Sequence, residues 1–347
     1  MRALILSAGL GERLRPLTNK KAKPALEFLN VPMLGFPYHW LETLGLSDVT
    51  FNTHYLPDTI RHAAMHVTAP EIQLHFTHED AILGSGGGIW NARFFLQGLG
   101  PDRTFAVANG DGVIVSSRPE LLREMLAYHR REHALATLLV CPLAGVGSKL
   151  PGVWVHPNGE VAGFGTAEKM EQDGLKGARS VDPKAPLECL HYASYMLFAK
   201  ELWSLLPDGS SNILYDVLEP HIGNGARVRA FRVSARDMQW FETGNATDYL
   251  DATRRCLEYL RDDHPFAHSL RQILEHHGPA FEMQSRLREM KLIADSATID
   301  PSARLHGFVV VGPECHIPAG CELENCVLLP GARLPEGAIT RGAVVVP

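Results

Sequence analysis

The stretch from Leu4 to Phe28 reads "LILSAGLGERLRPLTNKKAKPALEF". A short apolar run with strand character leads into a loop that contains Gly9 and Gly11 and collects basic residues before Pro24. Such a loop exposes backbone N–H groups that wrap phosphate oxygens, and its cations neutralise their charge. The pattern matches neither GxGxxG nor GxxxxGK[ST], so taken alone it is equally consistent with a surface loop of solvated Lys and Arg side chains.

The first 140 residues alternate short strand-like runs with helical patterns, which is typical of βαβ units. We therefore predict an α/β fold with a Rossmann-like, mostly parallel sheet and helices on both faces. The predicted strands are Ala3–Leu6, Val49–Asn52, Gln73–Phe76, Thr104–Ala108 and Ala136–Val140. The predicted helices are Pro37–Leu44, Leu56–His66, Gly88–Leu96 and Pro119–Glu132.

After Pro151 the pattern changes. The stretch "GVWVHPNGEVAGF" predicts a β-hairpin with Asn158-Gly159 at its turn. The remaining predicted strands are Cys189–Phe198 and Val228–Val233, and the remaining predicted helices are Leu202–Leu206, Ile213–Ile222 and Thr247–Leu260.

From residue 292 to the C-terminus the sequence repeats with a period of six. Aliphatic residues stand at Ile293, Ile299, Leu305, Val311, Ile317, Leu323 and Leu329, and small or β-branched residues follow four positions later, among them Cys315, Cys321 and Val327. A six-residue period is the signature of a parallel β-helix, here with room for about three coils. We expect a catalytic domain over residues 1–260, a helical linker over 261–291, and a short β-helix over 292–347.

The composition limits the class of protein. The chain has 347 residues, 45% hydrophobic content and a net charge of −6, with basic residues dispersed rather than clustered. This disfavours a nucleic-acid-binding surface. The six cysteines form no CxxC pair, and no apolar run approaches a membrane span. We expect a soluble, cytoplasmic protein without a membrane partner.

The whole opening stretch resembles the sugar-nucleotide pyrophosphorylase family, the sugar-1-phosphate nucleotidyltransferases, whose signature is approximately AGxGxRLxPLT followed by KP. Ala8 to Thr18 and Lys23-Pro24 meet every fixed position. Further motifs follow in the family's order. They are "LGSGGGI" from Leu83, "ANGD" ending at Asp111, "AEKM" around Lys169, and "WFETG" from Trp240.

The resemblance implies a role for each of these motifs. The catalytic residues would be Arg13 and Lys23, facing the triphosphate. The nucleotide-binding residues would be Ala8, Gly9, Gly11, Ser85, Gly86 and Gly87, with the base and ribose lying against bare backbone at Gly86 and Gly87. The sugar-phosphate-binding residues would be Glu168 and Lys169. Asp111 and Glu242 would bind Mg²⁺, the cofactor that the resemblance implies.

Two positions depart from the family pattern. Glu242 stands where the family usually has Asp, so its carboxylate reaches one methylene further. Tyr192-Ala193-Ser194 stands near the family's Asn-Ala-Gly, a turn that contacts the sugar. The identity of the sugar is therefore open.

The implied reaction joins a nucleoside triphosphate and a sugar 1-phosphate, releases pyrophosphate and gives a nucleotide-sugar. A left-handed β-helix frequently accompanies this domain, as in mannose-1-phosphate guanylyltransferases, so we expect guanylyl transfer to mannose 1-phosphate. The alternatives are uridylyl transfer to another sugar 1-phosphate such as N-acetylmuramate 1-phosphate, and a non-catalytic regulatory paralogue. Acyl transfer by the β-helix, with His306 or His316, is a further alternative. We expect the β-helix to form a homo-oligomer contact.

Overall fold

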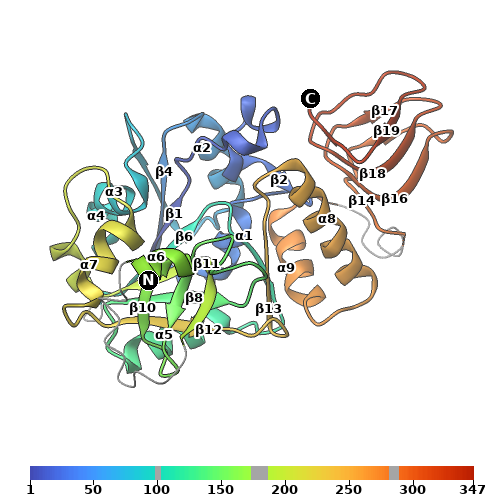
Figure 1. Cartoon of the computed structure of the whole chain (residues 1–347). Helices are drawn as coiled ribbons and strands as arrows, with labels where there is room; N and C mark the ends of the chain where they lie inside the picture. The colour runs from blue at the N-terminus through green and yellow to red at the C-terminus, as the bar shows by residue number, and fades with distance from the viewer. Residues whose placement is uncertain (98–102, 173–186, 281–288) are drawn as a thin grey trace.

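The computed structural model describes residues 1–97, 103–172, 187–280 and 289–347 (Figure 1). Nine of the described strands form the central sheet, in the order β10-β9-β11-β6-β1-β4-β5, with β8 paired to β11 and β12 paired to β8. Their bounds are β1 Arg2–Leu6, β4 Asp48–Thr53, β5 Gln73–His78, β6 Phe105–Asn109, β8 Ala136–Cys141, β9 Gly152–Val155, β10 Val161–Gly165, β11 Glu188–Phe198 and β12 Val228–Arg232.

The predicted mostly parallel α/β sheet is confirmed. Strands β5, β4, β1 and β6 run parallel to one another, and β8 and β12 form a further parallel pair. Strand β11 is antiparallel to β6, β8 and β9. The predicted hairpin is present as β9 and β10, with Gly159 at a φ of 84° in its turn.

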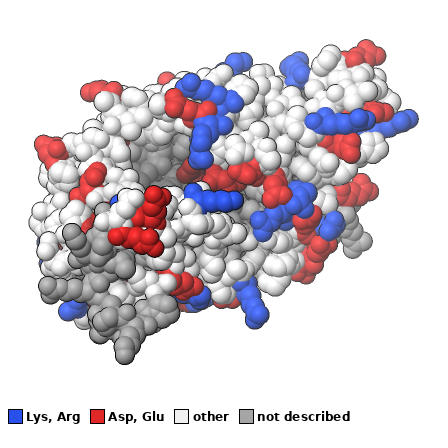
Figure 2. Space-filling model, in the orientation of Figure 1, with Lys and Arg blue, Asp and Glu red and all other residues white. Residues whose placement is uncertain are grey.

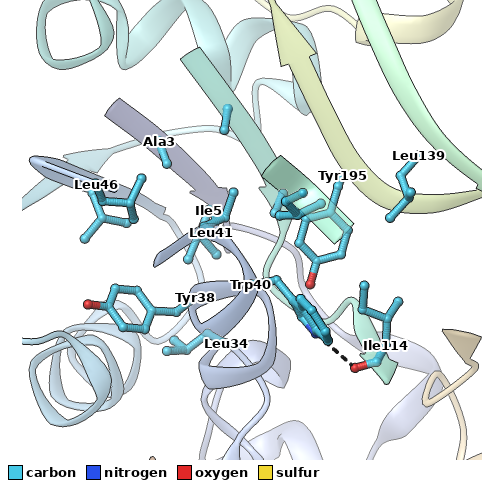
Figure 3. Close-up of a cluster of buried hydrophobic side chains, with 14 of the residues drawn as sticks. Ala3, Ile5, Leu34, Tyr38, Trp40, Leu41, Leu46, Ile114, Leu139 and Tyr195 are labelled. Atoms are coloured by element: carbon cyan, nitrogen blue, oxygen red, sulfur yellow. Dashed lines mark hydrogen bonds between the residues drawn. The ribbon is translucent and has the colours of Figure 1, made fainter. Parts of the chain in front are cut away.

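Helix α1 (Gly35–Glu42) lies beneath the sheet and is buried from Gly35 to Leu41. A helix that is apolar all round belongs in a core. Figure 3 shows Tyr38, Trp40 and Leu41 of α1 beside Ile5 of β1, in one cluster of buried side chains. The indole Nε1 of Trp40 donates a hydrogen bond of 3.3 Å to the carbonyl oxygen of Ile114.

The described residues form eight further α-helices. Their bounds are α2 Pro57–Val67, α3 Gly84–Asn91, α4 Arg93–Leu96, α5 Leu121–Arg131, α6 Ala167–Gln172, α7 Glu219–Ile222, α8 Ala246–Arg261 and α9 Ala267–His277. Two predicted α-helices have another form. Residues 200–204 make a 3₁₀ turn, and residues 213–218 make a π-helical turn that continues into α7.

Two small antiparallel pairs were not predicted. Strand β7 (Val113–Ser116) pairs with β13 (Met238–Phe241), and β2 (Glu27–Phe28) pairs with β3 (Val31–Pro32). The first pair matters for the site, because it joins two segments that are far apart in sequence.

Helices α8 and α9 lie between the central sheet and the C-terminal coils (Figure 1). One apolar cluster includes Phe28 of β2 and Val113 of β7, Leu257 and Leu270 on the helices, and Val310 on the coils. Helix α9 also contacts α1, α2, β3 and β7. The division of the chain at residues 261 and 291 remains a prediction, and residues 281–288 lie outside the described part.

The C-terminal region consists of parallel-paired strands. Strands β14 (Lys291–Ile293), β16 (Arg304–Val311), β18 (Glu322–Leu328), β19 (Ile339–Arg341) and β20 (Val344–Val345) form one parallel sheet. Strands β15 (Thr298–Ile299) and β17 (His316–Ile317) form a parallel pair. Leu305 lies opposite Leu323, 18 residues later, as three hexapeptides per coil require.

The six-residue register does not continue to Leu329, and that part of the prediction is wrong. Val311 lies opposite Leu328. The register changes because two residues separate His306 from Val309, whereas one residue, Asn325, separates their partners Glu324 and Cys326. Gly307 and Asn325 take up this irregularity with φ values of 59° and 54°, which Gly and Asn tolerate. Cys326 and Leu328 therefore occupy the coil interior, and Val327 and Leu329 instead join the cluster that contains α8 and α9.

Cys315 and Cys321 are buried in the coil interior, which confirms their predicted role in packing. All six cysteines are free.

On the face seen in Figure 2, acidic and basic side chains are interspersed. Within the described ranges, no helix is long and apolar enough to cross a membrane.

Candidate active site

The signature loop, residues 8–24, follows β1. Strands β1 and β6 are parallel and in register, with Leu6 opposite Asn109. The signature loop and Asp111 therefore leave the sheet at the same edge, where parallel α/β sheets bind ligands. Gly110 makes the close approach possible. Its N–H donates to the carbonyl oxygen of Leu6 at 2.8 Å, and a Cβ there would lie 3.0 Å from Cβ of Pro24.

This packing brings Lys23 to Asp111. The Nζ atom of Lys23 lies 2.6 Å from Oδ2 of Asp111. The Lys23 side chain is 11% exposed, so it is not the exposed loop lysine that the sequence suggests. A buried ammonium group requires a partner, and here the partner is the carboxylate predicted to bind metal.

Glu242 reaches the same place through the β7–β13 pair. Phe241 lies opposite Val113, so the residue after β13 emerges beside the segment that carries Asp111. Oε1 of Glu242 lies 4.0 Å from Nη2 of Arg13. Gly244 leaves room for both groups, because a Cβ there would lie 2.8 Å from Nη2 of Arg13 and would collide with Oε1 of Glu242.

These four residues line one cavity of about 290 Å³. The structure thus brings together both predicted catalytic residues and both predicted metal ligands. Asp111 and Glu242 are 38% and 40% exposed, which leaves both carboxylates accessible from the cavity. The other lining residues are Asn109, Pro151, Gly152, Val153, Phe164, His191, Tyr192, Ser194, Leu214, Tyr215, Trp240, Phe241 and Thr243.

The cavity also has an aromatic wall. The rings of His191 and Trp240 have centroids 4.1 Å apart. Nε2 of His191, the hydroxyl of Tyr192 and Nε1 of Trp240 are buried and have no hydrogen-bond partner among the residues that the structure describes. Buried polar atoms are normally paired, so this wall is suited to a ligand that carries hydroxyl groups.

Burial shifts the pKa values of His191 and Tyr192 in this wall. It lowers the pKa of His191 to about 4, so this imidazole is neutral at neutral pH and can both donate and accept a hydrogen bond. Burial, and then the charge of Asp111, raise the pKa of Tyr192. Ser194 completes the turn at a φ of 75°, a conformation that favours the glycine of the family pattern.

Lys169 lies behind this wall rather than on it. Its Nζ atom pairs with the carboxylate of Glu219 at 2.9 Å, donates to the carbonyl oxygen of Phe164 at 3.1 Å and sits 4.8 Å from the ring centroid of Tyr215. Phe164 and Tyr215 line the cavity, but neither Glu168 nor Lys169 is among the lining residues. Their role at the sugar phosphate remains a prediction.

The predicted nucleotide-binding residues lie in the signature loop and in the first turn of α3, and they are not among the lining residues of the cavity. In the signature loop, Gly9 has open space around its Cα, and Gly11 has a φ of 63° before a short 3₁₀ turn. The predicted glycine loop, residues 83–88, is Leu83 followed by the first residues of α3, and we keep its name. The N–H groups of Gly86 and Gly87 in it both donate to the carbonyl oxygen of Ser211.

The packing of the glycine loop gives a different reason for its glycines from the one that the resemblance implies. A Cβ on Gly86 would lie 2.5 Å from Oγ of Ser211, and a Cβ on Gly87 would lie 2.7 Å from Cβ of Leu83 and collide with the carbonyl oxygen of Gly209. These two glycines allow the 209–211 segment to cover the start of α3. Oγ of Ser85 accepts from the N–H of Ile213 at 2.9 Å and fastens the same segment.

Gly87→Ala should therefore destabilise the protein by about 2 kcal/mol, because the new methyl group forces backbone movement. Thermal unfolding monitored by circular dichroism measures this. Gly9→Ala is the matched control, since its Cβ would meet nothing within 4 Å. It should leave the melting temperature unchanged within error. Equal melting temperatures for the two variants would contradict this account of the glycine loop.

The donor set of the cavity fits a hard divalent cation. Within the described part of the chain, no group of three or more His, Cys, Asp or Glu side chains is placed to hold a metal ion. A Mg²⁺ ion that also binds substrate phosphates and water needs only one or two carboxylates. Asp111 and Glu242 meet that requirement, and each lies beside a basic group that a cation can replace.

Several residues of the site carry no sequence signal that we recognised. His191 and Glu219 are examples; the first precedes the Tyr192 turn, and the second stands in an ordinary helical stretch. His306 and His316, the candidates for acyl transfer, are exposed on the coils.

Comparison with known proteins agrees with the resemblance that the motifs carry. Residues 2–164 match the family model described as nucleotidyl transferase. A mannose-1-phosphate guanylyltransferase of Mycobacterium tuberculosis is 25% identical over 97% of this chain and 82% of its own length. A mannose-1-phosphate guanyltransferase of Schizosaccharomyces pombe is 28% identical over 99% of this chain and 85% of its own length. A UTP–glucose-1-phosphate uridylyltransferase of Synechocystis is 24% identical over 97% of this chain and 85% of its own length.

The matches to these relatives extend over nearly the full chain, and they agree with a cavity in which motif residues from three distant segments meet. Residues 2–164 match the nucleotidyl transferase model, and nearly the whole chain is similar to sugar-1-phosphate nucleotidyltransferases, which supports its assignment as an enzyme of that class.

Proposed function

We propose that this enzyme transfers a guanylyl group from GTP to mannose 1-phosphate, with release of pyrophosphate. The observation that carries the proposal is the composition of one cavity. Two cations and two carboxylates line it, and so do uncharged aromatic side chains with unpartnered polar atoms. The first set suits phosphates and a divalent cation, and the second suits a sugar.

The reaction forms a bond between a phosphate oxygen of the sugar 1-phosphate and the α-phosphorus of the triphosphate. The bond from the α-phosphorus to the bridging oxygen breaks, and pyrophosphate leaves with that electron pair. The nucleophile is already an anion at neutral pH, so no general base is needed. The task of the protein is to hold two anions together and to stabilise charge on the α-phosphate and the leaving group.

Arg13 and Lys23 supply that stabilisation in the proposal. Both cations belong to the signature loop, and both now contact a carboxylate. Phosphate oxygens of the triphosphate would take over these contacts. Asp111 and Glu242 are then free to hold Mg²⁺, which neutralises phosphate charge and fixes the geometry of the transfer when bound.

The aromatic wall would receive the sugar. Nε1 of Trp240 is a donor only, whereas the neutral imidazole of His191 and the hydroxyl of Tyr192 both donate and accept. Sugar hydroxyl groups have the same dual character, so they satisfy all three atoms. The aromatic faces at this wall add apolar contact area for the C–H face of a pyranose ring.

The choice of guanine and mannose rests on the relatives. The relatives from Mycobacterium tuberculosis and Schizosaccharomyces pombe are named for guanylyl transfer to mannose 1-phosphate, and the one from Synechocystis is named for uridylyl transfer to glucose 1-phosphate. Uridylyl transfer to another sugar 1-phosphate, such as N-acetylmuramate 1-phosphate, is therefore the second candidate.

A substrate panel tests the proposal. Pyrophosphate release is measured with GTP, UTP, ATP and dTTP, each against mannose, glucose and N-acetylmuramate 1-phosphate, with Mg²⁺ present. We expect the highest kcat/KM for GTP with mannose 1-phosphate. A higher value for UTP with either other sugar establishes the second candidate and refutes the first.

The proposal extends to the C-terminal coils and to the location of the enzyme. We propose that residues 292–347 form a short left-handed β-helix that makes a homo-oligomer contact, and that the enzyme works in the cytoplasm. Strand β19 is paired on one side only among the described strands, and its Ile339 is 64% exposed. An open strand edge with an exposed apolar residue is suited to covering by a second copy.

Ile339→Glu should weaken that contact, since a carboxylate buried between two copies has no partner. Light scattering should show a smaller mass for this variant than for the wild type at the same concentration. His306→Glu is the control, because residue 306 is also exposed but lies in the middle of the stack. An unchanged mass for Ile339→Glu would refute the contact at this edge.

A further inference from the structure

Three buried polar side chains connect the signature loop with the glycine loop. Ser7, Asn52 and Glu79 are each at most 2% exposed. The N–H of Ser7 donates to Oδ1 of Asn52 at 2.6 Å, and Nδ2 of Asn52 donates to Oε1 of Glu79 at 2.6 Å. Oε2 of Glu79 accepts from the N–H of Leu83 at 2.9 Å. One chain of hydrogen bonds thus joins the residue before the signature loop to the first residue of the glycine loop.

We infer that Asn52 and Glu79 are positioning residues that hold the two predicted nucleotide-binding loops at a fixed separation. The inference rests on the proposed function for its substrate. Neither side chain lines the cavity, so each would act only through the backbone that it holds. Loss of the connection should weaken binding of the triphosphate, which spans both loops, more than binding of the sugar 1-phosphate.

The pattern of donors explains why position 79 carries a carboxylate. Both ends of the chain of hydrogen bonds are backbone N–H groups, which only donate. The amide of Asn52 offers one acceptor and one donor, so the remaining member must accept on both sides. Only an ionised carboxylate does so. In the described residues, no Lys, Arg or His side chain forms an ion pair with Glu79. The two hydrogen bonds from Asn52 and Leu83 therefore stabilise its carboxylate.

The surrounding packing keeps this arrangement in place. A Cβ on Gly88 would lie 2.9 Å from Nδ2 of Asn52 and 3.2 Å from Oε1 of Glu79, so α3 packs directly on the pair. The hydroxyl of Ser7 makes a second bond, to the carbonyl oxygen of Asn52 at 2.6 Å. The pair therefore joins Ser7 at the end of β1, strand β4, which contains Asn52, and α3.

Glu79→Gln should break the connection. Glutamine has one acceptor and one donor, so one N–H must face another N–H. Turning the amide of Asn52 only moves the conflict to Ser7. We expect the KM for the best triphosphate of the substrate panel to rise about tenfold, with the KM for the sugar 1-phosphate changed by less than about twofold. Glu71→Gln, at an exposed glutamate, is the control and should behave as wild type.

An exchange of the two groups tests the logic directly. Asn52→Asp alone places two carboxylates against each other and should also raise the triphosphate KM about tenfold. The double variant Asn52→Asp/Glu79→Gln restores the order of acceptors and donors. The N–H of Ser7 then meets a carboxylate oxygen, the glutamine N–H₂ meets the other, and the glutamine oxygen meets the N–H of Leu83. Its triphosphate KM should return to within about threefold of wild type.

Each outcome decides the inference. A double variant no better than the worse single variant overturns it, as do single variants with an unchanged triphosphate KM. Equal rises of both KM values, with a lower melting temperature, indicate a purely structural role and also overturn it. Calorimetric titration of the same variants with each triphosphate measures the effect without turnover. A wild type that binds triphosphate but transfers no nucleotide counts against the proposed function alone.

Discussion

Lys23→Met is expected to lower kcat by about 1000-fold. Methionine keeps the apolar stem that packs beneath the loop and removes only the ammonium group. In the proposal, that group faces the triphosphate, where charge develops as pyrophosphate leaves. Because Lys23 is buried against Asp111, its cation is fixed before substrate arrives.

The structural cost of Lys23→Met should be small by comparison. Asp111 is 38% exposed and can be solvated when the ion pair is lost, so we expect destabilisation of about 1 kcal/mol. Steady-state kinetics and thermal unfolding are measured on the same preparation. Lys20→Met is the matched control, since Lys20 is an exposed lysine of the same loop. A Lys23→Met enzyme as active as Lys20→Met would mean that the loop lysines are only solvated surface.

Glu242→Gln is expected to lower kcat about 100-fold, whereas Glu242→Asp should keep much of the rate. The carboxylate lies beside the segment of Asp111 because β13 pairs with β7, so its charge is available to a shared Mg²⁺. Glutamine keeps the length and loses the charge. Aspartate keeps the charge and shortens the arm by about 1.5 Å, which returns it to the usual family residue.

The dependence of the rate on Mg²⁺ concentration separates metal binding from loop positioning. If Glu242 binds the cation, Glu242→Gln should need more Mg²⁺ for half-maximal rate. The loose contact with Arg13 is 4.0 Å long and largely exposed, so its loss alone predicts a small effect. An unchanged rate and Mg²⁺ dependence would assign Glu242 a structural role and leave Asp111 as the carboxylate of the site.

The sequence alone predicts the catalytic sheet well, since each predicted strand of the first 140 residues is present. Apolar runs with short helical segments between them determine such strands locally. The change of register in the C-terminal coils could not be predicted from the six-residue period of the sequence. It depends on Gly307 and Asn325, which adopt left-handed conformations at opposed positions of neighbouring coils.

The charged residues of the candidate site could be predicted from the sequence. The residues that position them could not. Arg13, Lys23, Asp111 and Glu242 belong to motifs with a fixed spacing. Burial of Lys23 depends on Gly110, whose lack of a side chain lets Pro24 approach, and no local pattern reports that contact. Asn52 and Glu79 look like ordinary polar residues at strand ends, because their roles depend on partners far away in sequence.

Transfer of label from the α-phosphate tests the central claim most directly. The wild-type enzyme is incubated with Mg²⁺, mannose 1-phosphate and GTP labelled at either the α- or the γ-phosphorus, and the products are separated. The account predicts that the α-label appears in the nucleotide-sugar and the γ-label in pyrophosphate, in equal amounts. Absence of α-label from any nucleotide-sugar, with every triphosphate and sugar 1-phosphate of the panel, would contradict it.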